Sequence, residues 1–284
     1  MNFGAVEKIA NAVLYEGYLL YPYRASAVKN QQRFNFGVIY PREYCERQGG
    51  SCAWEMRTEC LAFGAAETAI EIKVRFLQMI ECEGRQEGVE QEICISSLRL
   101  STLSSTPITR GFAFDGELRG EVEITAGLSS SATRIRLTVR NGTSDGTGDV
   151  LLRSLVSVHS IWGITEGEFI SLLDPAEEHK VAATSCENLG TFPVLVGEEG
   201  QRDMLLSSPI ILYDYPQIAP ESPGDLFDGT EIDEILALRI LTLTDAEKLE
   251  VRNGDDRARR ILERTESLPP EHFQKLHGAL RGLR

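Results

Sequence analysis

The chain has 284 residues, of which 42% are hydrophobic and 25% are charged, and its formal net charge is −14. These values are typical of a soluble globular protein with a core of ordinary size. The acidic balance disfavours a general nucleic-acid binder, because neutralising phosphates requires a basic face. It is compatible with a basic protein partner, with a cation, or with a role in solubility alone.

Two further features concern the cellular compartment. The N-terminus has no basic segment followed by an apolar run, and no apolar window has the length of a membrane span, so we expect a cytoplasmic protein without a membrane span. The cysteine spacing fits neither a paired CxxC zinc site nor a secreted disulfide framework, so we expect mostly free thiols. A metal held by Cys45, Cys52 and Cys60 with a distant fourth ligand is the alternative.

In chain order, residues 42–59 read as a loop around Gly49 and Gly50. The clearest strand follows, because apolar residues alternate with charged ones from Ile70 to Phe76. Similar strands are predicted around Ile93 and Ile95, and from Ile135 to Val139. This alternation indicates strands with one buried face and one solvated face.

Such strands recur at intervals of about ten to fifteen residues and are joined by Gly, Ser and Asn turns, without interposed helices. The pattern predicts a mainly β protein with an antiparallel β-sandwich-like body over residues 1–228. A division into two packed β subdomains near residues 105–115 is an alternative. Within the body, Thr165–Leu173 is predicted as a short capped helix and the KVAATS segment, residues 180–185, as extended.

The last part of the chain changes its period. Apolar residues recur at helical spacing after Thr230, as at Ile232, Ile235 and Leu236, and Thr230 and Thr244 each precede an acidic residue by three positions. The pattern predicts a helical C-terminal extension over residues 229–284. The extension either packs on its own body or serves as a docking arm.

The segment from Ser207 to Glu234 joins the two predicted parts. Pro216, Pro220 and Pro223 favour a stiff, extended backbone without a sheet ladder. Residues 198–234 carry ten acidic residues against one arginine, hence a net charge of −9. We therefore predict a docking surface for a protein partner with a basic surface, formed by Asp214, Tyr215, Glu221, Asp225, Asp228 and Glu231. An acidic connection that folds onto the basic C-terminal tail is the alternative.

Sequence motifs give little support for catalysis. The chain has no GxSxG serine elbow, no GxxxxGK[ST] phosphate loop and no GxGxxG after a strand. His159, His179 and Cys186, together with Asp214, would suit a borderline metal ion if the fold brought them together. The alternative is a structural role, because an isolated histidine at a strand end is more often a satisfied structural residue than a metal ligand. No other cofactor is expected.

Two segments are distinctive: VLYEGYLLYPYRASAVKNQQRFNFGVIYPREY near the N-terminus and TFPVLVGEEGQRDMLLSSPIILYDYPQIAPESPGDLFDGTEIDEILALRILTLT later in the chain. Together they resemble a family of uncharacterised proteins encoded beside nickel-iron uptake hydrogenases. The resemblance implies an accessory role in assembling or protecting a metalloenzyme, with hydrogenase subunits or maturation factors as partners. The expected function is therefore that of a non-enzymatic accessory or binding protein. The alternative is a metal-dependent or hydrolytic enzyme of unknown substrate.

Overall fold

The computed structural model describes residues 3–15, 37–82, 85–103, 106–114, 118–129, 132–217 and 244–252, and also 259, 262–263 and 266–267. The chain divides into two compact units, residues 1–14 with 35–216 and residues 15–34 with 217–284. The strands are β1 (Glu55–Cys82), β2 (Arg85–Arg99), β3 (Ile108–Ala113), β4 (Arg119–Ser129), β5 (Ala132–Asn141), β6 (Leu155–Ile170), β7 (Phe192–Leu195) and β8 (Met204–Ser208). The helices are α1 (Gly4–Tyr15), α2 (Arg42–Arg47), α3 (Leu100–Leu103), α4 (Lys180–Thr184) and α6 (Asp245–Arg252), with 3-10 turns η2 (Val150–Arg153) and η3 (Glu177–His179).

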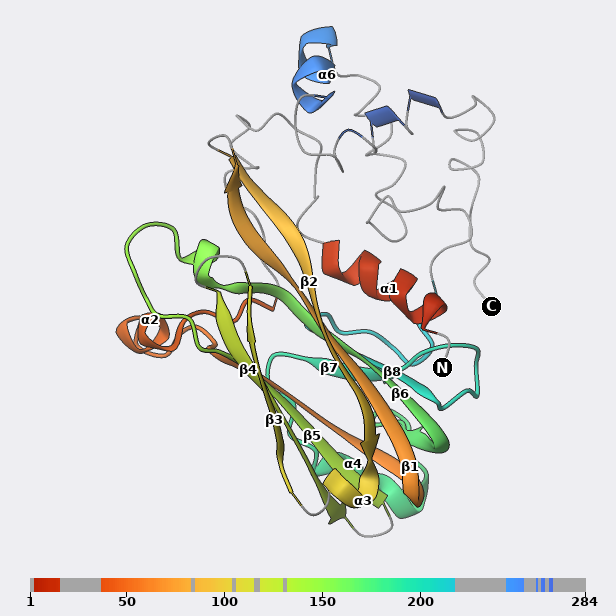
Figure 1. Ribbon diagram of the computed structural model, residues 1–284. Helices are drawn as coiled ribbons and strands as arrows, with labels where there is room; N and C mark the ends of the chain where they lie inside the picture. Colours follow the sequence, from red (N-terminus) through yellow and green to blue (C-terminus); the bar gives the residue numbers. More distant parts are fainter. Residues whose placement is uncertain are drawn as a thin grey trace. The chain divides into compact units, whose positions relative to one another are not determined.

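The first unit contains one antiparallel sheet in the order β3-β4-β5-β1-β6-β8-β7, with β2 also paired to β1. The long strand β1 organises it: β5 pairs with residues 55–62, β2 with residues 69–82, and β6 with residues 61–78. The pairing with β6 shifts register between Gly64 and Ala69 and again between Arg75 and Leu77. Such irregularities bend a strand and increase its twist, and the sheet curls into a half-barrel (Figure 1).

The prediction of a mainly β, antiparallel protein is confirmed. The sandwich-like arrangement is not confirmed, because the described strands form a single curled sheet and not two packed sheets. The physical reason is the length of β1, which has 28 residues. Its first part pairs with β5 and its last part with β2, so one continuous strand belongs to both ends of the curled sheet. The alternative boundary near residues 105–115 includes β3, and the strands before and after it belong to this one sheet.

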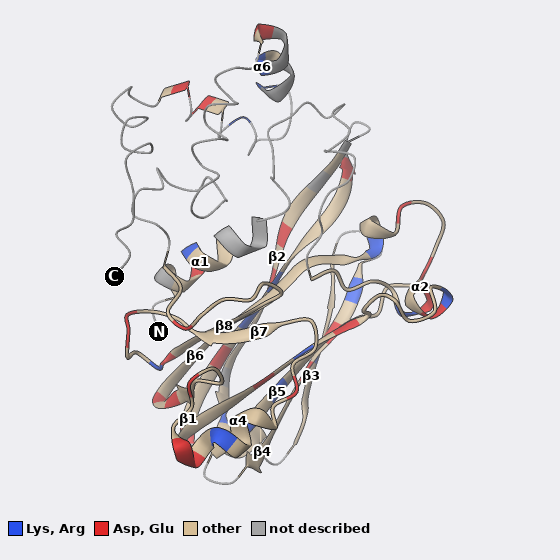
Figure 2. Cartoon of the chain, turned by 180° about the vertical axis from the view of Figure 1, so that it is seen from behind, with Lys and Arg blue, Asp and Glu red and all other residues tan. Residues whose placement is uncertain are grey.

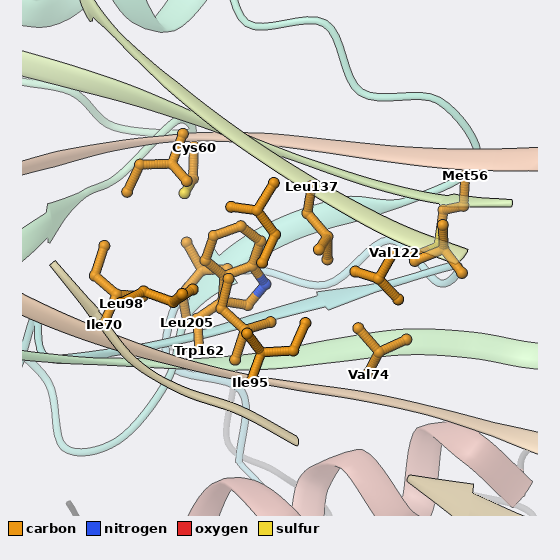
Figure 3. Packing of buried hydrophobic residues seen from close by; sticks show 14 of the residues in the cluster. Met56, Cys60, Ile70, Val74, Ile95, Leu98, Val122, Leu137, Trp162 and Leu205 are labelled. Carbon is orange, nitrogen blue, oxygen red and sulfur yellow. The ribbon is translucent and has the colours of Figure 1, made fainter. Parts of the chain in front are cut away.

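The core lies on the concave side of the sheet. Ile70, Ile72, Val74 and Phe76 of β1 are fully buried there, as their alternation predicts. Figure 3 shows such side chains packed around Trp162, whose ring meets Phe169 edge-to-face with centroids 6.4 Å apart. Burying a large apolar side chain stabilises the fold by about 1.5–3 kcal/mol, so this cluster is the main source of cohesion.

Three phenylalanine rings pack the edge strand β3 and the residue after it against the central strand β1. The ring of Phe76 lies 5.7 Å from that of Phe112 and 5.6 Å from that of Phe114. Gly120 on β4 makes room for this packing, since a Cβ there would meet the Phe112 ring and lie 2.5 Å from the carbonyl oxygen of Arg140. Only glycine fits this close approach.

Two short helical segments cover the convex side of the sheet. Val6 and Ala10 of α1 pack with Ile161 and Leu206, and Ala182 and Ala183 of α4 pack with Leu61. Between them, charged residues of both signs are interspersed along the strands (Figure 2). The convex face is therefore partly apolar under helices and partly a charged ladder.

Three local predictions are wrong. Residues 165–170 continue strand β6, since Phe169 is fully buried in the core and this tertiary contact overrides a helical capping pattern. The KVAATS segment forms helix α4, whose two alanines pack on the sheet. Residues 42–47 form helix α2 and strand β1 begins at Glu55, both inside the segment predicted as a loop.

The described part of the second unit contains α6, which begins directly after Thr244 as its pattern predicts. Glu266 forms ion pairs with Lys248 at 3.1 Å and with Arg252 at 2.7 Å. The side chain of Leu262 is buried. The predicted boundary at residues 228 and 229 lies outside the described residues, and the helical C-terminal extension as a whole is not confirmed. Among the described residues, no helix has the length and apolarity needed to cross a membrane.

Candidate functional site

We call residues 214–234 the acidic segment. Its root, Asp214 and Tyr215, is fixed to the edge strand β7 of the sheet. Strand β7 pairs with β8 through one edge, and after β8 the chain turns and runs back along the other. Asp214 Oδ1 accepts a hydrogen bond from the backbone N–H of Leu195 at 2.8 Å, and the backbone N–H of Tyr215 donates to the carbonyl oxygen of Leu195 at 2.7 Å. Both outward-facing backbone groups of Leu195 are therefore satisfied.

The second carboxylate oxygen of Asp214 strengthens this attachment. Asp214 Oδ2 accepts a hydrogen bond from Ser171 Oγ at 2.5 Å, and the same hydroxyl accepts from the N–H groups of Leu173 and Asp174. Tyr215 has a left-handed φ of 57° and packs partly buried against the core. Asp214 thus connects the end of β6, the edge of β7 and the start of the acidic segment.

Exposed apolar side chains flank this root. Ile211 is 75% exposed and Tyr213 is 88% exposed, and Phe192 at the start of β7 is 42% exposed. Aromatic side chains of this kind are enriched at the centres of protein interfaces, where they supply contact area at low entropic cost. Of the six predicted docking residues, Asp214 and Tyr215 lie here, and Glu221, Asp225, Asp228 and Glu231 lie outside the described residues.

The predicted metal ligands lie in separate environments. His159 is fully buried on β6 and is paired in register with Arg75 of β1. His179 ends η3 and lies 3.3 Å from a carboxylate oxygen of Glu178. Cys186 follows α4, and its thiol donates to the carbonyl oxygen of Ala182 at 3.6 Å. In the described part of the chain, no group of three or more His, Cys, Asp or Glu residues is placed to hold a metal ion.

The alternative cysteine set is also divided. Cys45 and Cys52 contact each other, whereas Cys60 is fully buried beside Cys186. Burial raises the pKa of the Cys60 thiol well above its usual value, and burial raises that of Cys186 to about 11. Both thiols therefore stay protonated near neutral pH and are poor nucleophiles.

His159 has one satisfied ring nitrogen and one unsatisfied. Its Nδ1 lies 3.0 Å from the carbonyl oxygen of Ser157, and because a carbonyl only accepts, Nδ1 carries the proton. Ser157 has φ 53° at the bulge opposite Arg75 and Leu77, where its carbonyl oxygen lies within hydrogen-bonding distance of Nδ1. Nε2 of His159 and Nη1 of Arg75 are both buried with no hydrogen-bond partner among the described residues.

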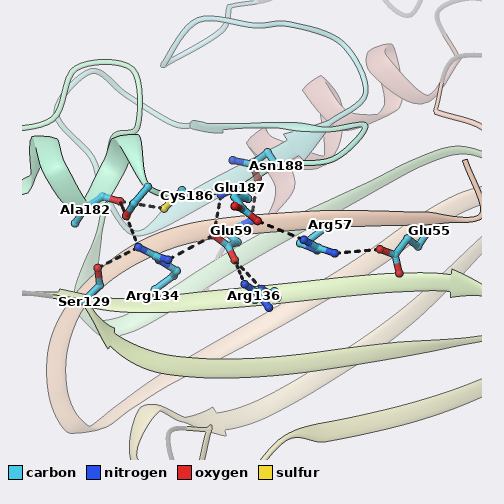
Figure 4. A network of polar contacts seen from close by, with 11 residues as sticks. Glu55, Arg57, Glu59, Ser129, Arg134, Arg136, Ala182, Cys186, Glu187 and Asn188 are labelled. Atoms are coloured by element: carbon cyan, nitrogen blue, oxygen red, sulfur yellow. Dashed lines mark hydrogen bonds and ion pairs between the residues drawn. The ribbon is translucent and has the colours of Figure 1, made fainter.

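A buried charge network, which the sequence analysis did not predict, lies on the convex face (Figure 4). Glu59, whose side chain is completely buried, forms an ion pair with Arg136 at 2.6 Å and accepts a hydrogen bond from the backbone N–H of Glu187 at 2.7 Å. Asn188 Oδ1 accepts from the backbone N–H of Glu59 at 2.8 Å. The network therefore holds residues 187–188 against the sheet. The available signal was alternation, since Arg134, Arg136 and Arg140 share one strand face opposite Glu55 and Glu59.

Comparison with known proteins adds no functional assignment. No protein-family model matches the chain, and no curated protein matches it significantly.

Proposed function

We propose that this protein is a non-enzymatic binding protein that docks a protein partner with a basic surface through the β7 edge and the acidic segment that starts there. The observation that carries the proposal is the fixed root at Asp214, which holds two exposed apolar side chains, Ile211 and Tyr213, beside the start of that segment. Fixing one end of the segment lowers the ordering cost of association, and the stiffness predicted from its three prolines would lower it further.

Charge complementarity identifies the kind of partner. The net charge of −9 over residues 198–234 attracts a basic surface and speeds encounter with it, and the apolar side chains of Ile211 and Tyr213 supply buried contact area. The resemblance to proteins encoded beside nickel-iron uptake hydrogenases makes hydrogenase subunits and their maturation factors the partners to test first. In this role the protein would assist assembly or protection of the enzyme.

The test measures binding of the full chain to purified hydrogenase subunits and maturation factors at several salt concentrations. The double change Asp225→Lys with Asp228→Lys should weaken association, chiefly by slowing it, and added salt should weaken the wild-type interaction. Glu43→Lys with Glu46→Lys is the matched control, because it makes the same charge change at two exposed positions of α2, outside residues 198–234. That control should weaken binding less.

A second pair of variants tests the apolar part. Tyr213→Ala should reduce affinity about tenfold or more, as expected for an exposed aromatic anchor. Leu128→Ala on β4 is the control, since Leu128 is 89% exposed and lies in another strand. Binding that ignores all these changes and salt would refute the docking surface. Loss of folding in the Asp225 and Asp228 variant would instead show that the acids hold the chain's own basic residues, such as Arg257 and Arg260.

A further inference from the structure

Two cysteines of the first unit are in direct contact. The Sγ atoms of Cys45 and Cys52 lie 2.7 Å apart. This separation is not far above the length of an S–S bond, about 2.0 Å. Cys45 is buried in α2, and Cys52 is partly exposed in the loop before β1. The two sulfurs therefore lie in position to form a covalent bond with little backbone movement.

A glycine pair explains why the chain returns to Cys45. Helix α2 ends at Arg47 with Gln48 as its C-cap, and Gly49 and Gly50 follow with φ values of 68° and 79°. The N–H of Gly50 donates to the carbonyl oxygen of Cys45 at 3.0 Å, and the N–H of Gly49 donates to that of Glu46 at 3.2 Å. These two bonds form a Schellman motif, which reverses the chain and needs a left-handed residue that glycine adopts without strain.

Contacts on both sides hold the two cysteines in this arrangement. The ring of Tyr44 stacks on that of Tyr40 with centroids 5.4 Å apart, and Arg42 lies over the ring of Trp54 at 4.8 Å. Arg47 forms an ion pair with Asp145 in the loop after β5. The close approach of the sulfurs is thus fixed by the surrounding residues on α2, on the strand start and on the neighbouring loop.

We propose that Cys45 and Cys52 are a thiol–disulfide exchange site that forms a reversible intramolecular disulfide with a low-molecular-weight disulfide such as oxidised glutathione as oxidant. The inference rests on the Cys45–Cys52 contact and is independent of the docking surface. The ring that the bond closes contains residues 45–52 and joins the last turn of α2 to the chain just before β1.

The exchange has two steps. The thiolate of Cys52 attacks one sulfur of oxidised glutathione, whose S–S bond breaks, and the first glutathione leaves as a thiolate that takes up a proton. Cys45 then loses its proton, and its sulfur attacks the sulfur of Cys52 in the mixed disulfide and releases the second glutathione. The two protein thiols supply two electrons in total, and one glutathione disulfide is reduced to two thiols.

The order of attack follows from the surroundings of each sulfur. Cys45 is only 2% exposed, and burial together with its contact with Cys52 raises the pKa of its thiol to about 12. A protonated, buried thiol does not attack an external disulfide. Cys52 is the accessible sulfur of the pair and reacts first, while Cys45 resolves the mixed disulfide.

The experiment treats the reduced full-length protein with oxidised glutathione, quenches with acid, alkylates the remaining thiols and digests with trypsin. Trypsin cleaves after Arg42, Arg47 and Arg57, so Cys45 and Cys52 fall in two different peptides. We expect these peptides to be joined, with the joined mass lower than the sum of the two by two hydrogen atoms. A reductant should separate them. Peptides that are never joined under these conditions would overturn the proposal.

Matched single variants test the two roles. In Cys45→Ser, Cys52 should accumulate as a stable mixed disulfide with glutathione, because the resolving thiol is absent. In Cys52→Ser, Cys45 should remain unmodified for at least ten times as long. Equal modification of the remaining cysteine in both variants would overturn the assigned order. Cys94→Ser, which removes an exposed cysteine elsewhere, should leave the joined peptides unchanged.

A third variant tests the geometry without removing a thiol. Gly49→Ala places a side chain at a positive φ, and nothing else lies within 4 Å of that position, so its effect is confined to the turn. Formation of the joined peptides should slow severalfold. An unchanged rate would contradict the role assigned to the glycine turn.

Discussion

Glu59 and Arg136 are joined by a buried ion pair at 2.6 Å, yet the two side chains differ in their exposure to water. The side chain of Glu59 is 0% exposed, whereas that of Arg136 is 44% exposed. Removing Glu59 and removing Arg136 should therefore affect stability differently. Without Glu59 the arginine can still be solvated, whereas without Arg136 the glutamate has no access to water.

We expect Arg136→Ala to destabilise the protein by about 3 kcal/mol, the lower end of the range for a broken buried pair, since the buried Glu59 carboxylate keeps the more distant Arg134 at 3.9 Å and the Glu187 N–H as partners. Glu59→Gln should cost less, about 1–3 kcal/mol, the range for a lost charge-assisted hydrogen bond. Urea unfolding measures both. Arg99→Ala, which breaks an exposed pair with Glu67, should change the unfolding free energy by less than about 1 kcal/mol. An Arg136→Ala variant no less stable than Glu59→Gln would contradict the asymmetry.

The two glycines of β4 give a matched pair for testing core packing. Gly120→Ala should destabilise the protein by about 1–3 kcal/mol, because the new methyl group meets the Phe112 ring and the backbone carbonyl of Arg140. Gly127→Ala lies on the same strand with nothing within 4 Å and should leave the stability unchanged or slightly increased. Thermal unfolding of the two variants provides the comparison, and equal effects would refute the packing argument.

Sequence reasoning succeeded where one physical rule acts alone. Period-two alternation identifies the strands around Ile72 and Leu137, because every second side chain of each strand is buried in the core and the side chains between them lie on the other face. It failed at Phe169, where a local pattern typical of a helix start is overridden by burial against Trp162. That contact depends on how the sheet curls, and no local pattern encodes it.

The candidate site shows the same division. Asp214 was singled out as part of an acidic segment, but its hydrogen bonds to Ser171 and Leu195 join residues 43 and 19 positions away. Cross-chain contacts of this kind are set by strand register, which a single sequence leaves open. Glu59 resembles any strand glutamate that faces solvent, and it becomes a buried node because residues 187–188 fold over it.

The root of the acidic segment gives a local prediction. Asp214→Ala removes the acceptor for the Leu195 N–H, so amide exchange at Leu195 should become faster, by an amount that corresponds to about 1.5–3 kcal/mol of local stability. Asp174→Ala is the control, since it removes an exposed carboxylate that neighbours Ser171 in sequence. Hydrogen–deuterium exchange over residues 192–195 measures both. Unchanged exchange in Asp214→Ala would show that other contacts fix the β7 edge.

His159 gives a prediction on pH dependence. Its burial lowers the pKa of the imidazole from 6.5 to about 4, the Ser157 carbonyl opposes this shift, and the positive charge of Arg75 adds to it. The folded protein therefore holds His159 neutral, while the unfolded chain takes up a proton as the pH falls below 6.5. The contribution of this group to stability is complete above pH 6.5 and is lost progressively as the pH falls to about 4, a loss of about 3 kcal/mol in total.

His159→Gln separates this effect from the titration of carboxylates, which both proteins share. Glutamine keeps a polar side chain but does not titrate, so the difference in unfolding free energy between wild type and variant should shift by about 3 kcal/mol, to the disadvantage of wild type, between pH 6.5 and pH 4. Urea unfolding at a series of pH values measures the shift, and the NMR signal of the His159 ring should keep its neutral position down to about pH 4. A ring that titrates near pH 6.5, or a difference that does not vary with pH, would show that His159 meets water and that its environment is more open than the fold indicates.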